Sequence, residues 1–561
     1  MIEDYIKAAK GVIPSETVIE GGMVNTVTGE IIETRVAIYG GKVVGIGDYD
    51  APVVIKSKYV CPGLIDGHVH IESSMLGPHG FSEAVASHGT TAVIADPHEV
   101  TNVMGIEGLE GFIGEARDCG IKIFIAAPPC VPASDLEMSN GRTTPEDLVM
   151  LMGNPSVIAV GEMMNYPGLL GLAPDIMKKL GVPGIKEGHA PGLSGKELNA
   201  YICAGVGSDH ECTTAEEALE KLRKGMWLMI REGACARNLN DVIGIAGTVK
   251  DTRHVMLVTD DRDAASIVNE GHMDHLVRSA ISAGVDPVEA IQMATINPAA
   301  RFGLPLGVIS PGVSADLVLL DDLESFKIRD VLINGRTYRD VHAKKRHVPV
   351  RQNTMALPAL GPEDICIRSD TDRRVRVIGV NENSIYTGSL VRNIKSTGGK
   401  LDPVPGDDIL KICMVRRYPG EKMVAAAFVE GFGLRAGALA QTIAHDSHNV
   451  IAVGANDSDI LAAIERLGEI GGGIVAASGD KVLSEVPLPY AGLMSDMPVE
   501  KVASAQAGMN QVVHIMGSRL HDPVIRLGFL GLSVVPELKM TCRGLVDVNR
   551  QKIVSVFADQ D

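Results

Sequence analysis

Histidines and carboxylates recur where short apolar segments of this chain end, and these residue types can hold metal ions. His68 and His70 are separated by one residue, so an extended strand points both imidazoles to the same face. Glu162 can bridge two cations, and a water shared between them would lose a proton near neutral pH. Four histidines and two carboxylates share this placement and would supply the ligands of two divalent cations: His68, His70, Glu162, His189, His210 and Asp260.

A second group of polar residues follows the same segments. Glu72 shares the face of His70 and is expected to orient the ligands from behind. Asp260 and Asp261 are adjacent, so strand alternation aims only one of them inward. We assign Asp260 to the metals and leave Asp261 as a loop-orienting, substrate-binding or surface carboxylate. Asp96, His98 and Glu99 are candidates for a further metal or substrate contact, with a hydrogen-bonded loop anchor as an equal interpretation. Arg231 and Glu232 are candidates to hold the substrate, with an internal ion pair as an equal interpretation.

Eight strand-like segments between about Cys61 and Gly303 carry these residues. Each is a short apolar run that ends in polar residues and precedes a helix-like stretch, which is the pattern of repeated βα units. Their number and total length predict an α/β fold with a (β/α)8 TIM barrel, in which catalytic groups lie at the carboxyl ends of the strands. The segments are YVCPGLIDGHVH, TTAVIADPHEV, IKIFIAAPPCV, VIAVGEMMN, GIKEGHA, VGSDHE, WLMIREGA and HVMLVTDDR.

Two further regions flank the predicted barrel. Residues 18–60 alternate apolar and polar side chains between Gly-rich turns, and residues 315–340 do the same, so the two segments are expected to pair into one small β-domain. From about Ile365, strand-like runs alternate with helical ones such as DSDILAAIERLGEI. The stretch AKKRHVPVRQNTMALPAL from Ala343 is interpreted as a linker or a surface-wrapping segment. The predicted domains are a composite β-sandwich (1–61 plus 304–350), the catalytic barrel (62–303) and a C-terminal α/β domain (365–561).

The composition of the chain bears on its size class and on the partners it is expected to bind. A chain of 561 residues, 45% of them hydrophobic, is expected to form roughly two to four domains. The formal net charge of −18 disfavours nucleic acid or an anionic membrane as a partner, because both attract clustered Lys and Arg. The first residues lack the features of a signal peptide, and no apolar stretch is long enough to cross a bilayer. We therefore expect a cytosolic protein.

Two other features are interpreted as structural. Nine cysteines are scattered without a CxxC pair, so most are expected to be buried reduced thiols, with Cys212 the strongest candidate for a thiol ligand or nucleophile. The run His445-Asp446-Ser447-His448 contains the residue types of a catalytic triad, but residues so close in sequence cannot readily adopt that geometry. We interpret the run as structural or as a loop near the barrel mouth.

The run PGLIDGHVHIESS, together with His210 and the aspartate of VTDDR, resembles the amidohydrolase superfamily over about the first 340 residues. Members of that superfamily join a composite β-sandwich to a metal-bearing TIM barrel. Many bridge their metals with a carbamylated lysine, whereas this chain has Glu162, in GEMMNYPG, at that place. The segments HVHIESSML, ADPHEVTNVMG, EGHAPGLSG and GSDHECTT narrow the resemblance to the adenine deaminase family. AHDSHNVIAVGAND and PYAGLMSD resemble that family's C-terminal domain.

The resemblance implies a hydrolytic deamination of adenine. A metal-activated hydroxide would attack C6 of the purine, and the tetrahedral intermediate would expel ammonia to leave hypoxanthine. Asp260 and Glu162 would shuttle the proton, His210 would stabilise the intermediate, and Arg231 and Glu232 are candidates to hold the purine. The six ligands given above match the family's metal residues. The family implies manganese as the productive metal, with ferrous iron as the alternative and zinc less favoured, and a homodimer as the assembly.

Two other classes of function remain open at the level of sequence. Another amidohydrolase reaction, such as cyclic amide hydrolysis, would be expected to use a lysine in the place of Glu162. Lys186 lies near the end of the fifth predicted strand, and its carbamylation would again make cyclic amide hydrolysis an expected reaction. A non-catalytic binding scaffold would be free to lose ligands, yet all six positions carry usable ones. The expected substrates are therefore adenine and water, with no nucleic acid or membrane partner.

Overall fold

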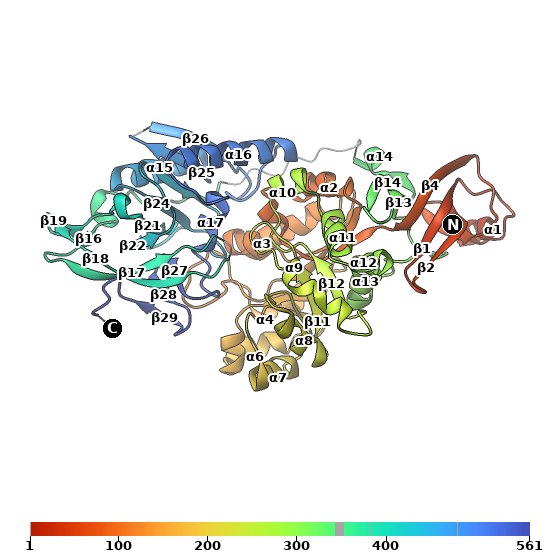
Figure 1. The fold of residues 1–561 in the computed structure, drawn as a ribbon, viewed down its shortest axis with the longest axis horizontal. Coiled ribbons are helices and arrows are strands. Elements are labelled where there is room, and N and C mark those ends of the chain that lie inside the picture. Colours follow the sequence, from red (N-terminus) through yellow and green to blue (C-terminus); the bar gives the residue numbers. More distant parts are fainter. Residues whose placement is uncertain (1, 343–352, 383, 480, 561) are drawn as a thin grey trace.

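Three sheet-based regions follow one another along the molecule (Figure 1). The computed structural model describes residues 2–342, 353–382, 384–479 and 481–560. The N-terminal sheet lies at one end, a curled parallel sheet with its helices lies in the middle, and the C-terminal region lies at the other end (Figure 1). Residues 343–352, the basic part of the predicted linker, lie outside the described residues. The predicted domain boundaries stay predictions.

The first sheet combines strands from two distant parts of the chain. Its order is β15-β14-β13-β4-β1-β2-β3, with β1 parallel to β4 and the other pairs antiparallel. Strand alternation turns Ile19, Val36 and Leu317 into one buried cluster. Helix α1 (Ile2–Ala9) packs beside β3. The strands are β1 (Thr17–Asn25), β2 (Glu30–Tyr39), β3 (Lys42–Ile46), β4 (Val53–Pro62), β13 (Leu317–Asp322), β14 (Lys327–Ile333) and β15 (Arg336–Thr337).

All eight strand segments predicted for the barrel are present. β5 to β9 form one parallel sheet and β10 to β12 form a second, and β5 and β6 are buried along their whole length, as expected of strands covered on both faces. The strands are β5 (Leu64–Val69), β6 (Thr90–Ala95), β7 (Lys122–Ala127), β8 (Val157–Met163), β9 (Ile185–Gly188), β10 (Ser208–Asp209), β11 (Trp227–Arg231) and β12 (Val255–Val258).

Asp260 joins the two parallel sheets just beyond β12. Its N–H donates to the carbonyl of His68 at 3.0 Å, and its carbonyl accepts from the N–H of His70 at 3.2 Å. A curled parallel α/β fold is thereby confirmed. A continuous eight-stranded ring stays a prediction, because the ladder divides into two sheets along the described strands.

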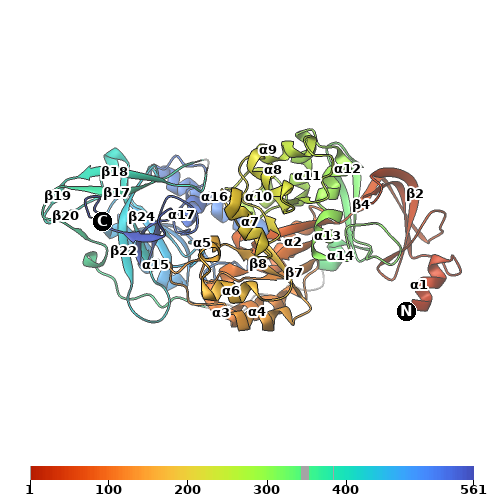
Figure 2. The same cartoon turned by 90° about the horizontal axis from the view of Figure 1, so that it is seen from below.

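Helices connect successive strands and lie outside the curled sheet (Figures 1 and 2). Side-chain caps begin several of them: for example, Thr144 accepts from the N–H of Asp147 before α4, and Thr214 accepts from the N–H of Glu217 before α8. The helices are α2 (Pro78–Ala86), α3 (His98–Ala116), α4 (Pro145–Met152), α5 (Tyr166–Leu170), α6 (Pro174–Leu180), α7 (Gly195–Cys203), α8 (Ala215–Arg223), α9 (Leu239–Val242), α10 (Ala264–Asn269), α11 (Met273–Ser282), α12 (Pro287–Met293), α13 (Ile296–Phe302) and α14 (Tyr338–His342).

The C-terminal region is built on an eight-stranded mixed sheet of order β18-β17-β22-β21-β24-β23-β25-β26. Two three-stranded sheets accompany it, β16-β20-β19 and β27-β28-β29. Its elements are β16 (Ile367–Arg368), β17 (Arg373–Gly379), β18 (Gly388–Ile394), β19 (Ser396–Thr397), β20 (Lys400–Leu401), β21 (Ile409–Val415), β22 (Val424–Glu430), β23 (Ala438–Gln441), β24 (Val450–Gly454), α15 (Asp457–Ile470), β25 (Gly473–Ser478), β26 (Lys481–Pro487), α16 (Val499–Ile515), α17 (Pro523–Phe529), β27 (Leu538–Thr541), β28 (Gly544–Asp547) and β29 (Lys552–Val554).

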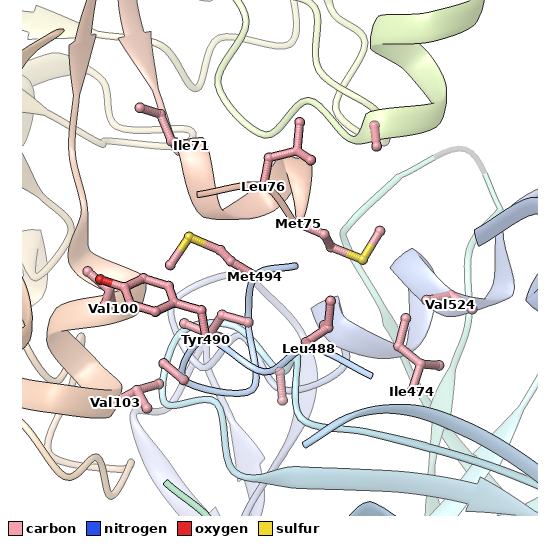
Figure 3. Close-up of a cluster of buried hydrophobic side chains, with 14 of the residues drawn as sticks. Ile71, Met75, Leu76, Val100, Val103, Ile474, Leu488, Tyr490, Met494 and Val524 are labelled. Carbon is pink, nitrogen blue, oxygen red and sulfur yellow. The ribbon is translucent and has the colours of Figure 1, made fainter. Parts of the chain in front are cut away.

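The C-terminal region shares a hydrophobic core with the curled sheet. Ile71, Leu76 and Val100 pack in one buried cluster with Tyr490 and Met494 (Figure 3). The first three residues follow the carboxyl ends of β5 and β6, so the C-terminal region covers the edge at which the predicted ligands lie. None of the described helices is both long enough and apolar enough to cross a membrane.

Candidate metal centre

The carboxylate of Glu162, at the end of β8, lies between two pairs of histidines. Its Oε1 atom is 3.2 Å from His70 Nε2 and 3.9 Å from His68 Nε2. Its Oε2 atom is 2.7 Å from His189 Nδ1 and 3.3 Å from His210 Nε2. All five side chains are buried. One carboxylate oxygen therefore faces the histidines of β5, and the other faces those that follow β9 and β10.

Asp260 completes the first of these groups. Its Oδ1 atom is 3.1 Å from His70 Nε2 and 3.6 Å from His68 Nε2. Its φ of 57° is a left-handed conformation that few residues other than glycine adopt, although aspartate is among those that do. The two hydrogen bonds to β5 hold the backbone in this conformation. The structure thus brings together all six residues that the sequence assigns to the metals.

Asp96, which follows β6, fixes two of these ligands from behind. The carbonyl of Asp96 accepts from His70 Nδ1 at 2.9 Å, so the Nε2 atom of a neutral His70 carries a free lone pair toward Glu162. Asp96 Oδ2 accepts from the N–H of Glu162 at 2.8 Å. A Cβ atom at Gly161 would lie 2.1 Å from that oxygen. Only glycine at position 161 leaves room for this contact.

The distances and the donor atoms fit divalent cations. Ligand atoms held about 2.1 Å from one cation lie about 3.0 to 3.5 Å from each other, which is close to the separations around Glu162 and Asp260. His68 Nε2 is buried and makes no hydrogen bond. A buried nitrogen without a hydrogen-bond partner, aimed at two carboxylates, fits the role of a metal ligand. These residues could hold divalent metal ions, and the adjacent triads that share Glu162 offer more than one position.

Charge keeps both carboxylates ionised. Burial alone would raise the pKa of Glu162, but hydrogen bonds from His189, His210 and His70 hold that pKa well below its usual range. Burial would likewise raise the pKa of Asp260, but the neighbouring imidazoles of His68 and His70 hold that pKa well below its usual range. Both groups are therefore available as anionic ligands.

Arg231, at the end of β11, forms an internal ion pair. Its Nη1 atom is 3.0 Å from Asp260 Oδ2, and its Nη2 atom donates to Glu211 Oε2 at 3.0 Å. Glu211 Oε1 also lies 3.6 Å from His189 Nδ1 and 3.5 Å from His210 Nε2. Glu211 was missed by the sequence analysis, although its position next to His210 in GSDHE could have suggested it.

The other candidate residues divide into two groups. His98 and Asp261 line the cavity beside the ligands, with His98 Nδ1 at 3.5 Å from Glu162 Oε1. Glu72 instead accepts from the N–H of Val100, and the carboxylate of Glu232 accepts from the N–H of Leu239. Glu72 and Glu232 are absent from the cavity lining formed by the described residues. Glu99 faces the C-terminal region, where its Oε1 atom is 3.0 Å from His445 Nδ1.

Lys186 and Cys212, which the sequence offers as a carbamylated lysine and as a thiol ligand or nucleophile, have other partners in the structure. Lys186 Nζ donates to the carbonyl of Gly184 at 3.4 Å, at the opposite end of β9 from His189. Cys212 donates to Asp209, and burial raises the pKa of its thiol well above the ordinary value. Neither side chain lines the cavity among the described residues.

The C-terminal region supplies the other wall of the cavity. Its lining residues are Ile385, His445, Asp446, Phe529 and Leu532, which face Glu162, His189, His210 and Asp260. The HDSH run therefore lies at the mouth of the curled sheet. That position is one of the two alternatives expected from its sequence.

Comparison with known proteins bears on the whole chain. The amidohydrolase family model matches residues 59–338, and the model of the adenine deaminase C-terminal domain matches residues 384–552. Adenine deaminase of Desulfatibacillum aliphaticivorans is 42% identical over 99% of this chain and 100% of its own length. The chain belongs to the adenine deaminase family. The Archaeoglobus fulgidus member is 42% identical over 99% of this chain and 98% of its own, and the Kosmotoga olearia member is 39% identical over the full length of both.

Membership of the adenine deaminase family bears out the resemblance found in the sequence. It also accounts for both walls of the cavity, because one family model covers the ligand-bearing strands and the other covers residues 385, 445, 446, 529 and 532. A family of metal-dependent hydrolases together with these ligand clusters supports divalent metal binding by this chain.

Proposed function

We propose that this protein hydrolyses adenine to hypoxanthine and ammonia, which is the reaction expected of the adenine deaminase family. The observation that carries the proposal is the place of Glu162 between two pairs of histidines, in a chain that matches that family from end to end. The carboxylate occupies the position in which a carbamylated lysine would favour cyclic amide hydrolysis. Lys186 is the other candidate for a carbamylated lysine, and its Nζ atom donates to the carbonyl of Gly184 instead.

We assign two divalent cations to the six ligands, with manganese preferred to ferrous iron and zinc. Glu162 would bridge them, His68, His70 and Asp260 would hold one, and His189 and His210 the other. When bound, the cations would supply a hydroxide nucleophile near neutral pH. Burial of the ligand set excludes bulk water from the reacting centre, which strengthens each electrostatic contact.

Asp260 is assigned as the proton shuttle. Its Oδ1 atom faces the histidines of β5 and its Oδ2 atom faces Arg231, so the carboxylate is fixed at the edge of the cavity. It would receive the proton of the nucleophilic water and deliver it to the ring nitrogen and to the departing amine. Such transfers contribute about 10²- to 10⁴-fold to the rate. His210, at 3.3 Å from Glu162, is assigned to stabilise the tetrahedral intermediate.

Conversion of adenine tests this proposal directly. The protein is produced with manganese supplied and iron chelated, and the change of adenine to hypoxanthine is followed by ultraviolet absorbance and by ammonia release. We expect Glu162→Gln to lose activity together with bound metal. We expect Asp260→Asn to lower kcat by about 10²- to 10⁴-fold.

An exposed carboxylate provides the matched control. Glu324 is exposed in the N-terminal sheet, and Glu324→Gln should keep full activity and metal content. A protein that holds two metal ions per chain and leaves adenine unchanged would refute the proposal. Cyclic amides and other aminopurines would then be the substrates to screen.

The assembly and the location are separate proposals with tests of their own. We propose a homodimer from the family resemblance, to be tested by light scattering of the purified protein. We propose a cytosolic location, which the free cysteines favour, since oxidising compartments tend to pair them. Fractionation of cells with an antibody against the protein tests it.

A further inference from the structure

One loop of the C-terminal region reaches the metal ligands. Residues 442–449 connect β23 to β24, and His445 and Asp446 from this loop line the same cavity as Glu162 and Asp260. Asp446 Oδ1 lies 3.6 Å from His98 Nε2, and the other ring nitrogen of His98 lies 3.5 Å from Glu162. A single imidazole therefore separates Asp446 from the bridging carboxylate.

The loop is held firmly in place. His445 Nδ1 lies 3.0 Å from Glu99 Oε1, and Asn449 Nδ2 donates to the carbonyl of Met138 at 2.7 Å. The His445 ring stacks on Phe529 with ring centroids 4.5 Å apart. Contacts from both sides of the interface thus fix the position of Asp446 before any ligand enters.

Lys539 supports the apolar part of the same wall. Its buried ammonium group donates to the carbonyls of Ile385 at 2.8 Å and Phe529 at 3.0 Å. Both residues line the cavity, and Leu532 lies beside them. The wall formed by the C-terminal region therefore presents apolar side chains together with the carboxylate of Asp446 and the imidazole of His445.

Glu99, His445 and His448 also lie close enough to suggest a further metal site. Hydrogen bonding argues against it. His448 Nδ1 accepts from the N–H of Ala444 at 3.2 Å, so the proton of a neutral His448 is on Nε2, the atom that faces Glu99. An Nε2 atom that carries a proton cannot bind a metal, and the cluster is an anchor for the loop.

Asp446 has one oxygen that accepts no hydrogen bond from any of the described residues. Its Oδ2 atom is buried and makes no hydrogen bond, although the side chain lines the cavity. A buried acceptor without a partner is destabilising unless a ligand supplies a donor. Adenine has two kinds of N–H group, the exocyclic amine and the N–H of its five-membered ring. The amine must face the metal ligands, which leaves the ring N–H as the donor for the opposite wall.

We propose that Asp446 is a substrate-binding residue, which accepts a hydrogen bond from the five-membered-ring N–H of the purine while Ile385, Phe529 and Leu532 cover its apolar face. The inference rests on the proposed function and extends it, because it assigns base recognition to the C-terminal region. It also predicts a preference for the free base. A purine substituted at that ring nitrogen would leave the carboxylate buried and unpaired, a situation that lowers kcat/KM by about 10⁴-fold in comparable sites.

The isosteric change Asp446→Asn tests the proposal in the full-length, manganese-loaded protein. An amide in place of the carboxylate loses the charge-assisted hydrogen bond, so kcat/KM for adenine should fall roughly 10- to 100-fold. Binding of unsubstituted purine, which keeps the ring N–H and lacks the amine, should weaken by a similar factor in calorimetry. Asp407→Asn, an exposed change in the same region, is the control and should alter neither quantity.

Four measurements separate the outcomes: adenine turnover, purine affinity, bound manganese and melting temperature. Turnover of adenine by the unchanged protein decides the proposed function by itself. If that turnover is present and Asp446→Asn keeps purine affinity within about twofold, the role of Asp446 in binding is wrong. Loss of bound manganese with unchanged purine affinity would likewise overturn it, since Asp446 would then act on the metals through His98. Weaker purine binding at full metal content and unchanged melting temperature supports the proposal.

Discussion

At the scale of single residues, the missing side chain of Gly161 matters as much as the ligands beside it. Asp96 can accept from the N–H of Glu162 only because no Cβ atom stands between them. The same aspartate fixes the ring of His70 through its carbonyl. One residue thus orients two ligands, and metal ligands that lose such support commonly bind 10- to 100-fold more weakly.

Gly161→Ala should therefore weaken metal binding. The added methyl group would displace the carboxylate of Asp96, so we expect metal affinity and activity to fall by about 10- to 100-fold. Metal content after dialysis against a graded chelator measures the first quantity, and adenine turnover the second. Gly244→Ala is the matched control, because a Cβ atom there has no heavy atom within 4 Å. Equal metal retention in the two variants would refute the role given to Gly161.

At the scale of elements, α8 supports the loops that carry two of the histidines. Lys221 Nζ donates to Asp209 Oδ2 at 2.9 Å and to the carbonyl of Ala190 at 2.7 Å. Asp209 in turn accepts from the backbone N–H groups of Ala190 and Glu211. These contacts link the short strands β9 and β10 just where His189 and His210 follow them.

Lys221→Met should destabilise the protein strongly. The change would leave the carboxylate of Asp209 buried without its cation, and breaking a buried ion pair in this way costs about 3 to 5 kcal/mol. Unfolding in urea, followed by circular dichroism, measures the loss. Lys224→Met removes an ion pair that is partly exposed on the same helix and should cost about 1 kcal/mol or less. A loss below 1 kcal/mol for Lys221→Met would contradict the buried role.

The elements also show what a sequence can and cannot predict. The six ligands stand at the ends of five strands, so the run of apolar residues before each is enough to place it. The partner of a side chain is harder to predict when it comes from a distant segment. The sequence leaves the role of Arg231 open between substrate binding and an ion pair, and the structure places Glu211 beside it. Nothing in the sequence of the HDSH run reveals that Asp446 faces His98.

At the scale of the whole molecule, the C-terminal region and the curled sheet act as one unit. Apolar packing joins them (Figure 3). The buried contact between Glu99 and His445 also spans the two regions. Burial would lower the pKa of His445, but the charge and hydrogen bond of Glu99 raise it from 6.5 to about 9. The imidazole is therefore cationic at neutral pH.

This interface should weaken in alkaline solution. A histidine whose pKa is higher in the folded state than in the unfolded state stabilises the fold fully below pH 6.5, and that stabilisation is lost as the pH rises through about 9. We expect up to about 3 kcal/mol to disappear over this range. Melting temperatures of the wild type and Glu99→Gln between pH 6 and 10 measure it. Parallel curves for the two proteins would show that the ion pair does not contribute.

The pairing of β4 with β13 has a consequence for how the chain is made on the ribosome. Val60 of β4 lies opposite Leu319 of β13. On the ribosome, β4 therefore stays unpaired along this side until its partner strand is synthesised 259 residues later. At 5 to 20 residues per second, that wait lasts roughly 13 to 52 s. During it the nascent strand presents open hydrogen-bonding groups that could pair with another chain. Slower translation between residues 62 and 317 would therefore lower the yield of native protein without altering a single residue.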